Sequence, residues 1–312
     1  MLLADETGPA PKLLCKRWGK ALGRRVRLTG LLRRSPRNAR ASLCVAALAI
    51  ASASGPAVAA PPPEANAPIP HEPEALSQAL TETTADLRAA IDKWVPKGKA
   101  APNDVTLYAL YQQRIYRLLA PNKDLARRTV ARLPRGLADV SRDFLVAHRE
   151  LYRLTPPIPG RTIKVGPALP AGVLLRYYGD GERRFRVPWN VLAAVNFVES
   201  KFGKLRSPSA AGAQGPMQFL PTTWRRYGLG GNVHDAHDAI IGAANYLHAS
   251  GAPGNLRRAL HAYNPSAAYV DAVLRYARRM RADRTTYYAL YSWQVFVKTP
   301  SGDRRVTGPG LP

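Results

Sequence analysis

The sequence predicts a mainly helical protein that ends in a short β-hairpin. Apolar residues recur at the spacing of one helix face in several segments between residues 73 and 283. After residue 284 apolar and mixed residues alternate, which is typical of strands. The chain of 312 residues therefore predicts one or two helical domains, once a leader is removed, and a small β tail.

Residues 1–60 have the composition of an export signal with a basic extension. Eleven Lys and Arg lie between Lys12 and Arg40, an apolar run covers residues 43–53, and small residues precede Pro61. The apolar run is too short to span a bilayer stably. We expect cleavage near Ala59, no stable membrane span afterwards, and export to the periplasm, the cell wall or the medium.

Charge and cysteine content narrow the possible partners. The 46 Lys and Arg against 21 Asp and Glu give a net charge of +25, of which about +16 remains without the leader. An exported protein this basic is expected to concentrate on anionic polymers such as those of the cell wall. A nucleic-acid partner is disfavoured by the leader and by the lack of a recognised motif. Cys15 and Cys44 both lie in the leader, so the mature fold needs no disulfide and no cysteine-based metal site.

The mature chain divides into five segments. Residues 61–72 are rich in Pro and Ala and indicate a flexible or extended spacer. Residues 73–155 predict a small helical region, and residues 156–170, with five prolines, indicate a linker. Residues 171–283 form a second helical block. Residues 284–312 predict a β tail, in which the stretch from Tyr287 to Val297 alternates and residues 300–303 form a hairpin turn.

The helix predicted from Trp189 to Glu199 carries the first candidate for catalysis. Leu192, Val195, Glu199 and Phe202 fall on one helical face. A carboxyl group on an apolar face loses hydration, which raises its pKa. An acid that stays protonated near neutral pH suits general acid catalysis. Spacing alone favours the plainer alternative, a glutamate at a helix end that points to water.

Three motifs in order favour the catalytic alternative. They are Glu199-Ser200, the segment Gly212-Ala213-Gln214-Gly215-Pro216-Met217-Gln218 with Pro221 and Thr223 behind it, and Ala262-Tyr263-Asn264. Together they resemble the catalytic domain of the soluble lytic transglycosylases, a domain type shared with goose-type lysozymes. The resemblance covers roughly residues 173–282. Between Asn264 and Tyr269 the chain lacks the Gly-containing loop and acidic residue that the family often has.

The resemblance implies a lysozyme-like helical fold and an enzyme of peptidoglycan. Such enzymes cleave the β-1,4 bond between N-acetylmuramic acid and N-acetylglucosamine. The residue that matches Glu199 protonates the leaving oxygen and then takes a proton from the C6 hydroxyl of the muramyl sugar, which leaves a 1,6-anhydro end. Neither a metal nor a cofactor takes part.

The resemblance also assigns residues to the glycan groove. Met217 and Gln218 match a pair that lines the sugar site, and Tyr263 matches a tyrosine whose hydroxyl lies close to the catalytic acid. The further matches are Ser209, Tyr246 and Asn264. For Ser209 an ordinary turn serine is an equal alternative, and Tyr246 could equally be a core residue.

Two other functions remain open. Asp235 and Asp238 precede the helix predicted from residue 239, where capping is the usual role of Asp. If one of them instead activates water, the enzyme is a hydrolytic muramidase like the goose-type lysozymes. A non-catalytic wall-binding protein is the third candidate, against which the intact Glu199, Gln218 and Tyr263 argue.

Overall fold

The computed structural model describes residues 61–95, 100–157 and 163–311. The predicted export signal, its cleavage site and both cysteines lie outside these residues. The described part of the chain is mainly helical and ends in a two-stranded antiparallel sheet, which confirms the predicted fold class. None of its helices combines the length and apolar character that a bilayer crossing needs.

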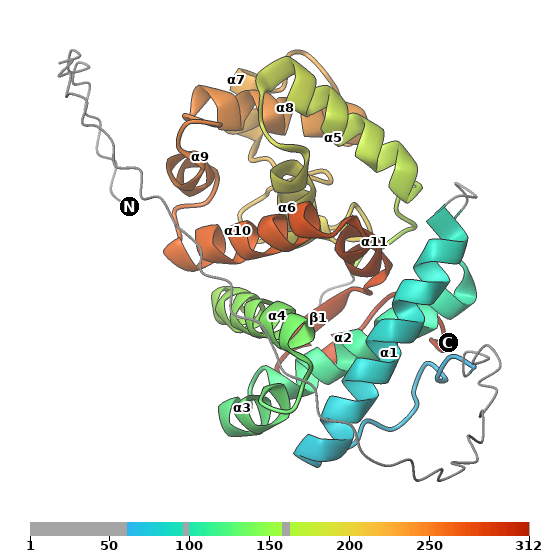
Figure 1. The fold of residues 1–312 in the computed structure, drawn as a ribbon. Helices are drawn as coiled ribbons and strands as arrows, with labels where there is room; N and C mark the ends of the chain where they lie inside the picture. Colours follow the sequence, from blue (N-terminus) through green and yellow to red (C-terminus); the bar gives the residue numbers. More distant parts are fainter. Residues whose placement is uncertain (1–60, 96–99, 158–162, 312) are drawn as a thin grey trace, which may run out of the picture. The chain divides into compact units, whose positions relative to one another are not determined.

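Four helices form the N-terminal region (Figure 1): α1 Pro73–Trp94, α2 Asn103–Leu119, α3 Lys123–Val130 and α4 Arg135–Leu154. The predicted apolar face of α1 is the face that becomes buried, whereas on α2 the buried face is shifted and, of the predicted Leu107, Tyr111, Ile115 and Leu118, only Ile115 is buried. Leu87, Ile91 and Trp94 are buried on α1, and Ile115 is buried on α2. α1 packs on α2, and α2 contacts α4.

The second block contains the remaining helices (Figure 1): α5 Ala171–Phe185, α6 Trp189–Ser200, α7 Pro221–Tyr227, α8 Ala236–Ala249, α9 Leu256–Tyr263, α10 Ala267–Ala282 and α11 Arg284–Ser292. α6 is buried on nearly all sides, because α5, α8, α10 and α11 all contact it. Local capping fixes several starts. The side chains of Asp235, Asn255 and Ser266 accept backbone amides at the first turns of α8, α9 and α10.

The predicted strand over residues 287–297 is wrong in its first half. Residues 284–292 form helix α11, which the Asp283 side chain caps through the amide of Thr285. Tyr287, Leu290 and Tyr291 are buried at helical spacing. Tyr287 and Tyr291 are four positions apart, a spacing that fits both a strand and a helix. This short stretch therefore did not distinguish a strand from a helix. Strands begin only with β1 (Phe296–Thr299) and β2 (Gly302–Arg305), which pair through the predicted turn.

The Pro- and Ala-rich segment 61–72 is held against the folded chain. The Tyr111 hydroxyl donates to the carbonyl of Pro68 at 3.1 Å. The guanidinium of Arg114 donates to the carbonyls of Ala67 at 2.7 Å and Ala65 at 3.3 Å. The segment turns at Glu64–Ala67, and these hydrogen bonds hold it on α2.

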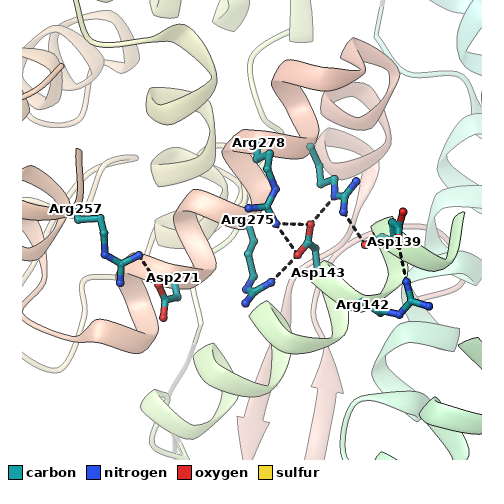
Figure 2. A network of polar contacts seen from close by, with 8 residues as sticks. Asp139, Arg142, Asp143, Arg257, Asp271, Arg275 and Arg278 are labelled. Atoms are coloured by element: carbon teal, nitrogen blue, oxygen red, sulfur yellow. Dashed lines mark hydrogen bonds and ion pairs between the residues drawn. The ribbon is translucent and has the colours of Figure 1, made fainter. Parts of the chain in front are cut away.

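A cluster of charges joins the N-terminal region to the second block (Figure 2). Asp143 on α4 has a side chain only 5% exposed and accepts hydrogen bonds from three arginines of α10. They are Arg275 at 2.6 Å, Arg278 at 2.8 Å and Arg279 at 2.5 Å. Three arginines on one carboxylate hold its pKa below the usual range, although burial opposes this. This cluster ties α10 to α4.

We expect Asp143→Asn to destabilise the protein by about 3 kcal/mol, because it removes the anion that three close guanidinium groups share. The midpoint of guanidinium unfolding measures the change. The matched control is Asp139→Asn one turn earlier, since Asp139 pairs with Arg142 at the surface and should matter by about 0.5 kcal/mol or less. Equal midpoints for the two variants would contradict the role given to Asp143.

Candidate active site

Glu199 lies in the last turn of α6 on the face that packs into the core. Leu192 and Val195 on that face are fully buried, and Phe202 just beyond the helix is 2% exposed. The Glu199 carboxyl is partly buried. The helical spacing predicted this shared face, and the alternative of a glutamate that points freely to water does not describe it.

Burial and one hydrogen bond define the state of this carboxyl. Loss of hydration raises the pKa of Glu199 to about 7, while the hydrogen bond from Tyr269 and the charge of Lys201 act in the opposite direction. The Tyr269 hydroxyl donates to Oε1 of Glu199 at 2.7 Å. Tyr269 is itself 2% exposed and lies in the first turn of α10. Glu199 is therefore a carboxylic acid that changes protonation near neutral pH.

The hydroxyl that bonds to Glu199 comes from Tyr269 and not from Tyr263, to which the resemblance gave this contact. The Tyr263 hydroxyl donates to the carbonyl of Met217 at 2.7 Å. Tyr263 still lies near the acid, since the charge of Glu199 contributes to the raised pKa of the Tyr263 hydroxyl. The two tyrosines lie on opposite sides of the bend between α9 and α10, and sequence order alone did not distinguish them.

The glycine-rich segment is attached directly to the end of α6. The carbonyl of Pro216 accepts hydrogen bonds from the Ser200 hydroxyl at 2.5 Å and from the Asn196 side chain at 2.8 Å. The Tyr178 hydroxyl on α5 donates to the same Asn196 side chain at 2.7 Å. Ser200 and Asn196 thus hold the segment beside Glu199. Ser200 belongs to a recognised motif, whereas no signal in the sequence indicated Asn196.

Gly215 lets this segment approach the chain behind it. Its φ of 72° lies in the left-handed region, and an added Cβ would stand 1.9 Å from the carbonyl oxygen of Val233. A short bridge between Gln214 and Phe219 closes the turn. Within it, Gln218 has a φ of 50° and its side-chain amide donates to the carbonyl of Gly215 at 3.0 Å. Gln218 is partly exposed, so its amide remains a candidate to contact a sugar.

Met217 does not line a groove with its side chain, contrary to the prediction. It is fully buried because the turn between Gly215 and Phe219 points it into the core. Its carbonyl, which accepts from Tyr263, is the part that belongs to the site. Ser209 takes part in a turn, since its hydroxyl accepts the amide of Ala213 at 3.0 Å, and its contact with a sugar stays a prediction.

Tyr246 and Tyr263 form part of an aromatic group beside the glycine-rich segment. Their ring centroids are 5.5 Å apart, and Tyr263 meets Phe219 edge-on at 5.8 Å. The Tyr246 hydroxyl donates to the carbonyl of Ala262 at 2.6 Å, which fixes the end of α9. Asn264 follows α9 and is partly buried. Partly exposed aromatic faces suit sugar rings.

Asp235 caps α8, and Asp238 holds the loop that precedes it. The Asp235 side chain accepts the amide of Asp238 at 3.0 Å, in the first turn of the helix. The Asp238 side chain accepts the amide of Asn232 at 2.9 Å, four residues before the helix begins. In the described residues, no three His, Cys, Asp or Glu side chains are grouped as ligands for a metal ion.

Comparison with known proteins identifies the domain that holds this site. Residues 176–285 match the family model described as Transglycosylase SLT domain. The match confirms the resemblance drawn from the three motifs, and it covers α6, the glycine-rich segment, α9 and α10. No curated protein and no solved structure matches the chain significantly. The N-terminal helices and the β-hairpin lie outside the matched residues.

We expect Tyr269→Phe to raise the pKa of Glu199 above about 7, because the hydroxyl that stabilises the carboxylate is lost. Carbon-13 NMR titration of the glutamate carboxyls measures the pKa, with Glu199→Gln identifying the resonance. Tyr263→Phe is the matched control, since its hydroxyl bonds to Met217 instead. If both variants shift the midpoint equally, the Tyr269 contact does not set it.

We also expect Glu199→Gln to stabilise the fold at alkaline pH. Below about pH 4.5 the Glu199 carboxyl is protonated in both the folded and the unfolded chain, so its burial costs little folding free energy. As the pH rises from there through about 7, only the folded chain keeps the proton, and stability falls until the buried group ionises. The variant should be more stable by about 3 kcal/mol at pH 8 and nearly unchanged at pH 4.

Guanidinium unfolding at the two pH values measures this difference. Glu74→Gln is the control, because the side chain of Glu74 is 86% exposed and should give no pH-dependent gain. A gain of the same size at pH 4 would show that the carboxyl is not destabilised by ionisation.

Proposed function

We propose that this chain, whose residues 176–285 form a transglycosylase SLT domain, is a peptidoglycan lytic transglycosylase with Glu199 as its acid and base. The reaction cleaves the β-1,4 bond between N-acetylmuramic acid and N-acetylglucosamine and forms a 1,6-anhydromuramyl end. The observation that carries the proposal is the partly buried Glu199 carboxyl, which accepts a hydrogen bond from Tyr269 at 2.7 Å and whose pKa burial raises to about 7.

The first step is proton donation. With a pKa of about 7, Glu199 holds its proton in a large share of molecules at neutral pH. The proton goes to the glycosidic oxygen, whose bond to the anomeric carbon of the muramyl sugar breaks. Tyr269 occupies Oε1, so we assign the transfer to Oε2.

The second step uses the carboxylate left by the first. Glu199 accepts the proton of the C6 hydroxyl as its oxygen bonds to the anomeric carbon of the same sugar. The enzyme ends with its proton restored, and no water is consumed. An attacking group within the same sugar gains from proximity, which makes one carboxyl sufficient where most glycosidases use two.

A hydrolytic muramidase is the second candidate, and the contacts of two aspartates weigh against it. An inverting hydrolase needs another carboxylate to activate water. Of the two candidates in the sequence, Asp235 caps α8 and Asp238 accepts the amide of Asn232 in the loop before it. These structural roles support the single-carboxyl reaction.

The charge of the chain fits a wall substrate. About +16 remains after the predicted leader is removed. We propose that the exported protein acts on peptidoglycan strands in the periplasm, the wall or the medium, and that anionic wall polymers concentrate it there.

We expect wild-type protein to release muropeptides with 1,6-anhydro ends from purified peptidoglycan. Glu199→Gln should lower the rate by at least about 100-fold, because an amide can neither donate nor accept the proton. Mass spectrometry of the soluble products separates anhydro from reducing ends. Asp235→Asn is the control and should retain its activity and its anhydro products, since it changes a cap.

Reducing ends from wild-type protein, lost in Asp235→Asn, would favour the muramidase. Normal digestion by Glu199→Gln would overturn the assignment of Glu199. Binding of peptidoglycan without release of fragments by wild-type protein would favour a wall-binding role.

A further inference from the structure

Three tyrosines from three helices form a continuous row of rings. The rings of Tyr263, at the end of α9, and Tyr246, on α8, are 5.5 Å apart between centroids and inclined by 36°. Tyr246 and Tyr227, at the end of α7, are closer, at 4.5 Å and 31°. We call these three side chains the tyrosine row. Tyr263 and Tyr246 were expected in the groove from the sequence, whereas Tyr227 was not.

The inner end of the tyrosine row is connected to the catalytic candidate. The Tyr263 hydroxyl donates to the carbonyl of Met217 at 2.7 Å. The carbonyl of Pro216, one residue earlier, accepts a hydrogen bond from the Ser200 hydroxyl at 2.5 Å, and Ser200 follows Glu199. These contacts fix Tyr263 beside the end of α6, where Glu199 lies. A ligand bound at Glu199 can therefore extend along the row.

The tyrosine row rests on the core and is also accessible from outside. Phe219, which is 3% exposed, contacts Tyr263 at 5.8 Å and Tyr246 at 6.4 Å between ring centroids. All three tyrosines are themselves partly exposed. A tyrosine with an apolar body on the core and a wet edge offers a ligand both ring surface and a hydroxyl.

The outer end of the row carries polar groups that have no partner in the fold. The hydroxyls of Tyr263 and Tyr246 each donate to a backbone carbonyl. Within the described ranges, the Tyr227 hydroxyl makes no hydrogen bond, and the exposed guanidinium of Arg226 has neither an acidic partner nor a hydrogen-bond acceptor. The contact of Arg226 is with the Tyr227 ring, whose centroid lies 5.3 Å from its Cζ.

This contact prepares Arg226 to bind an anion. An aromatic face attracts a guanidinium and restricts its position, while its N–H donors remain free at the planar edge. The planar group can offer two parallel donors to one carboxylate. Arg225, the preceding residue, is also exposed, but no aromatic contact or ion pair holds it in the described part of the chain. The two neighbouring arginines thus differ in how they are held.

We propose that Arg226, held on Tyr227 at the outer end of the tyrosine row, is a specificity-determining residue that binds a carboxylate of the peptide stem on a glycan strand lying along the row. This rests on the proposed function, because it takes peptidoglycan as the substrate. The stem is attached to the muramyl sugars of the strand itself. A strand that reaches from Glu199 along the row therefore brings carboxylates with it, at a spacing that its sugars fix.

The test compares two preparations of soluble, phosphate-free peptidoglycan strands. Both are acetylated at their amines, and one is then amidated at its stem carboxylates. The ratio of the two KM values measures the preference for carboxylates. In wild-type protein this ratio should favour the carboxylate strands about threefold more than in Arg226→Gln, as expected for one exposed ion pair, while kcat changes little. Arg226→Lys should retain a preference, since the charge remains.

The matched control is Arg225→Gln, which removes the same charge one residue away. It should keep the wild-type ratio, because Arg225 is not held on the tyrosine row. A second measurement does not require turnover. Calorimetric binding of the two kinds of strand to Glu199→Gln, with and without Arg226→Gln, should show the same threefold difference in preference.

Two outcomes would overturn the proposal. One is an equal KM ratio in wild-type protein and Arg226→Gln. The other is an equal loss of preference in Arg225→Gln, which would show that net charge and not this residue is responsible. If wild-type protein releases no muropeptides but the binding preference depends on Arg226 as expected, the subsite stands and the proposed lytic reaction fails.

Discussion

Burial of the Glu199 carboxyl on the inner face of α6 is the constraint on which the site depends. A carboxyl buried without compensation can reach a pKa of about 8–9 and would then rarely act as a base near neutral pH. A carboxyl in open water would rarely act as an acid. The hydrogen bond from Tyr269 and the charge of Lys201 oppose the effect of burial, and the pKa settles at about 7. One group can then serve both halves of a reaction that moves one proton each way.

Because Tyr269 lies on α10, its hydrogen bond to Glu199 depends on where α10 packs. Its hydroxyl must stay within hydrogen-bond distance of Oε1, so α10 must hold a fixed place against α6. α10 packs on α6 along one side and on α4 along another, and on the α4 side the Asp143 cluster adds charge-assisted hydrogen bonds (Figure 2). The N-terminal region thus supports the helix that supplies the partner of the acid, although it lies outside the matched domain.

The sequence predicted the helical architecture and placed Glu199 on an apolar helix face for local physical reasons, whereas its choice as the catalytic residue came from the three motifs together. Helix faces repeat at a fixed spacing, and the run from Trp189 to Glu199 is long enough to show it. The features that the sequence did not predict depend on contacts between segments that are distant in the chain. The bend between α9 and α10 decides whether Tyr263 or Tyr269 bonds to Glu199. A turn that needs Gly215 decides that Met217 is buried. α11 was missed because its buried tyrosines also fit an alternating pattern.

The two lysines after Glu199 show how the chain beyond the matched residues joins the site. Lys204 donates to the carbonyls of Tyr291 at 2.6 Å and Trp293 at 2.7 Å, which ties the segment after α6 to the end of α11. Burial and the charge of Lys201 lower the pKa of Lys204 to about 7. Lys204 is thus committed to two backbone acceptors, whereas Lys201 has one acceptor and an aromatic ring. The charges of the two lysines repel each other, and separate contacts hold both: Lys204 on the end of α11, and Lys201 on the carbonyl and ring of Phe197.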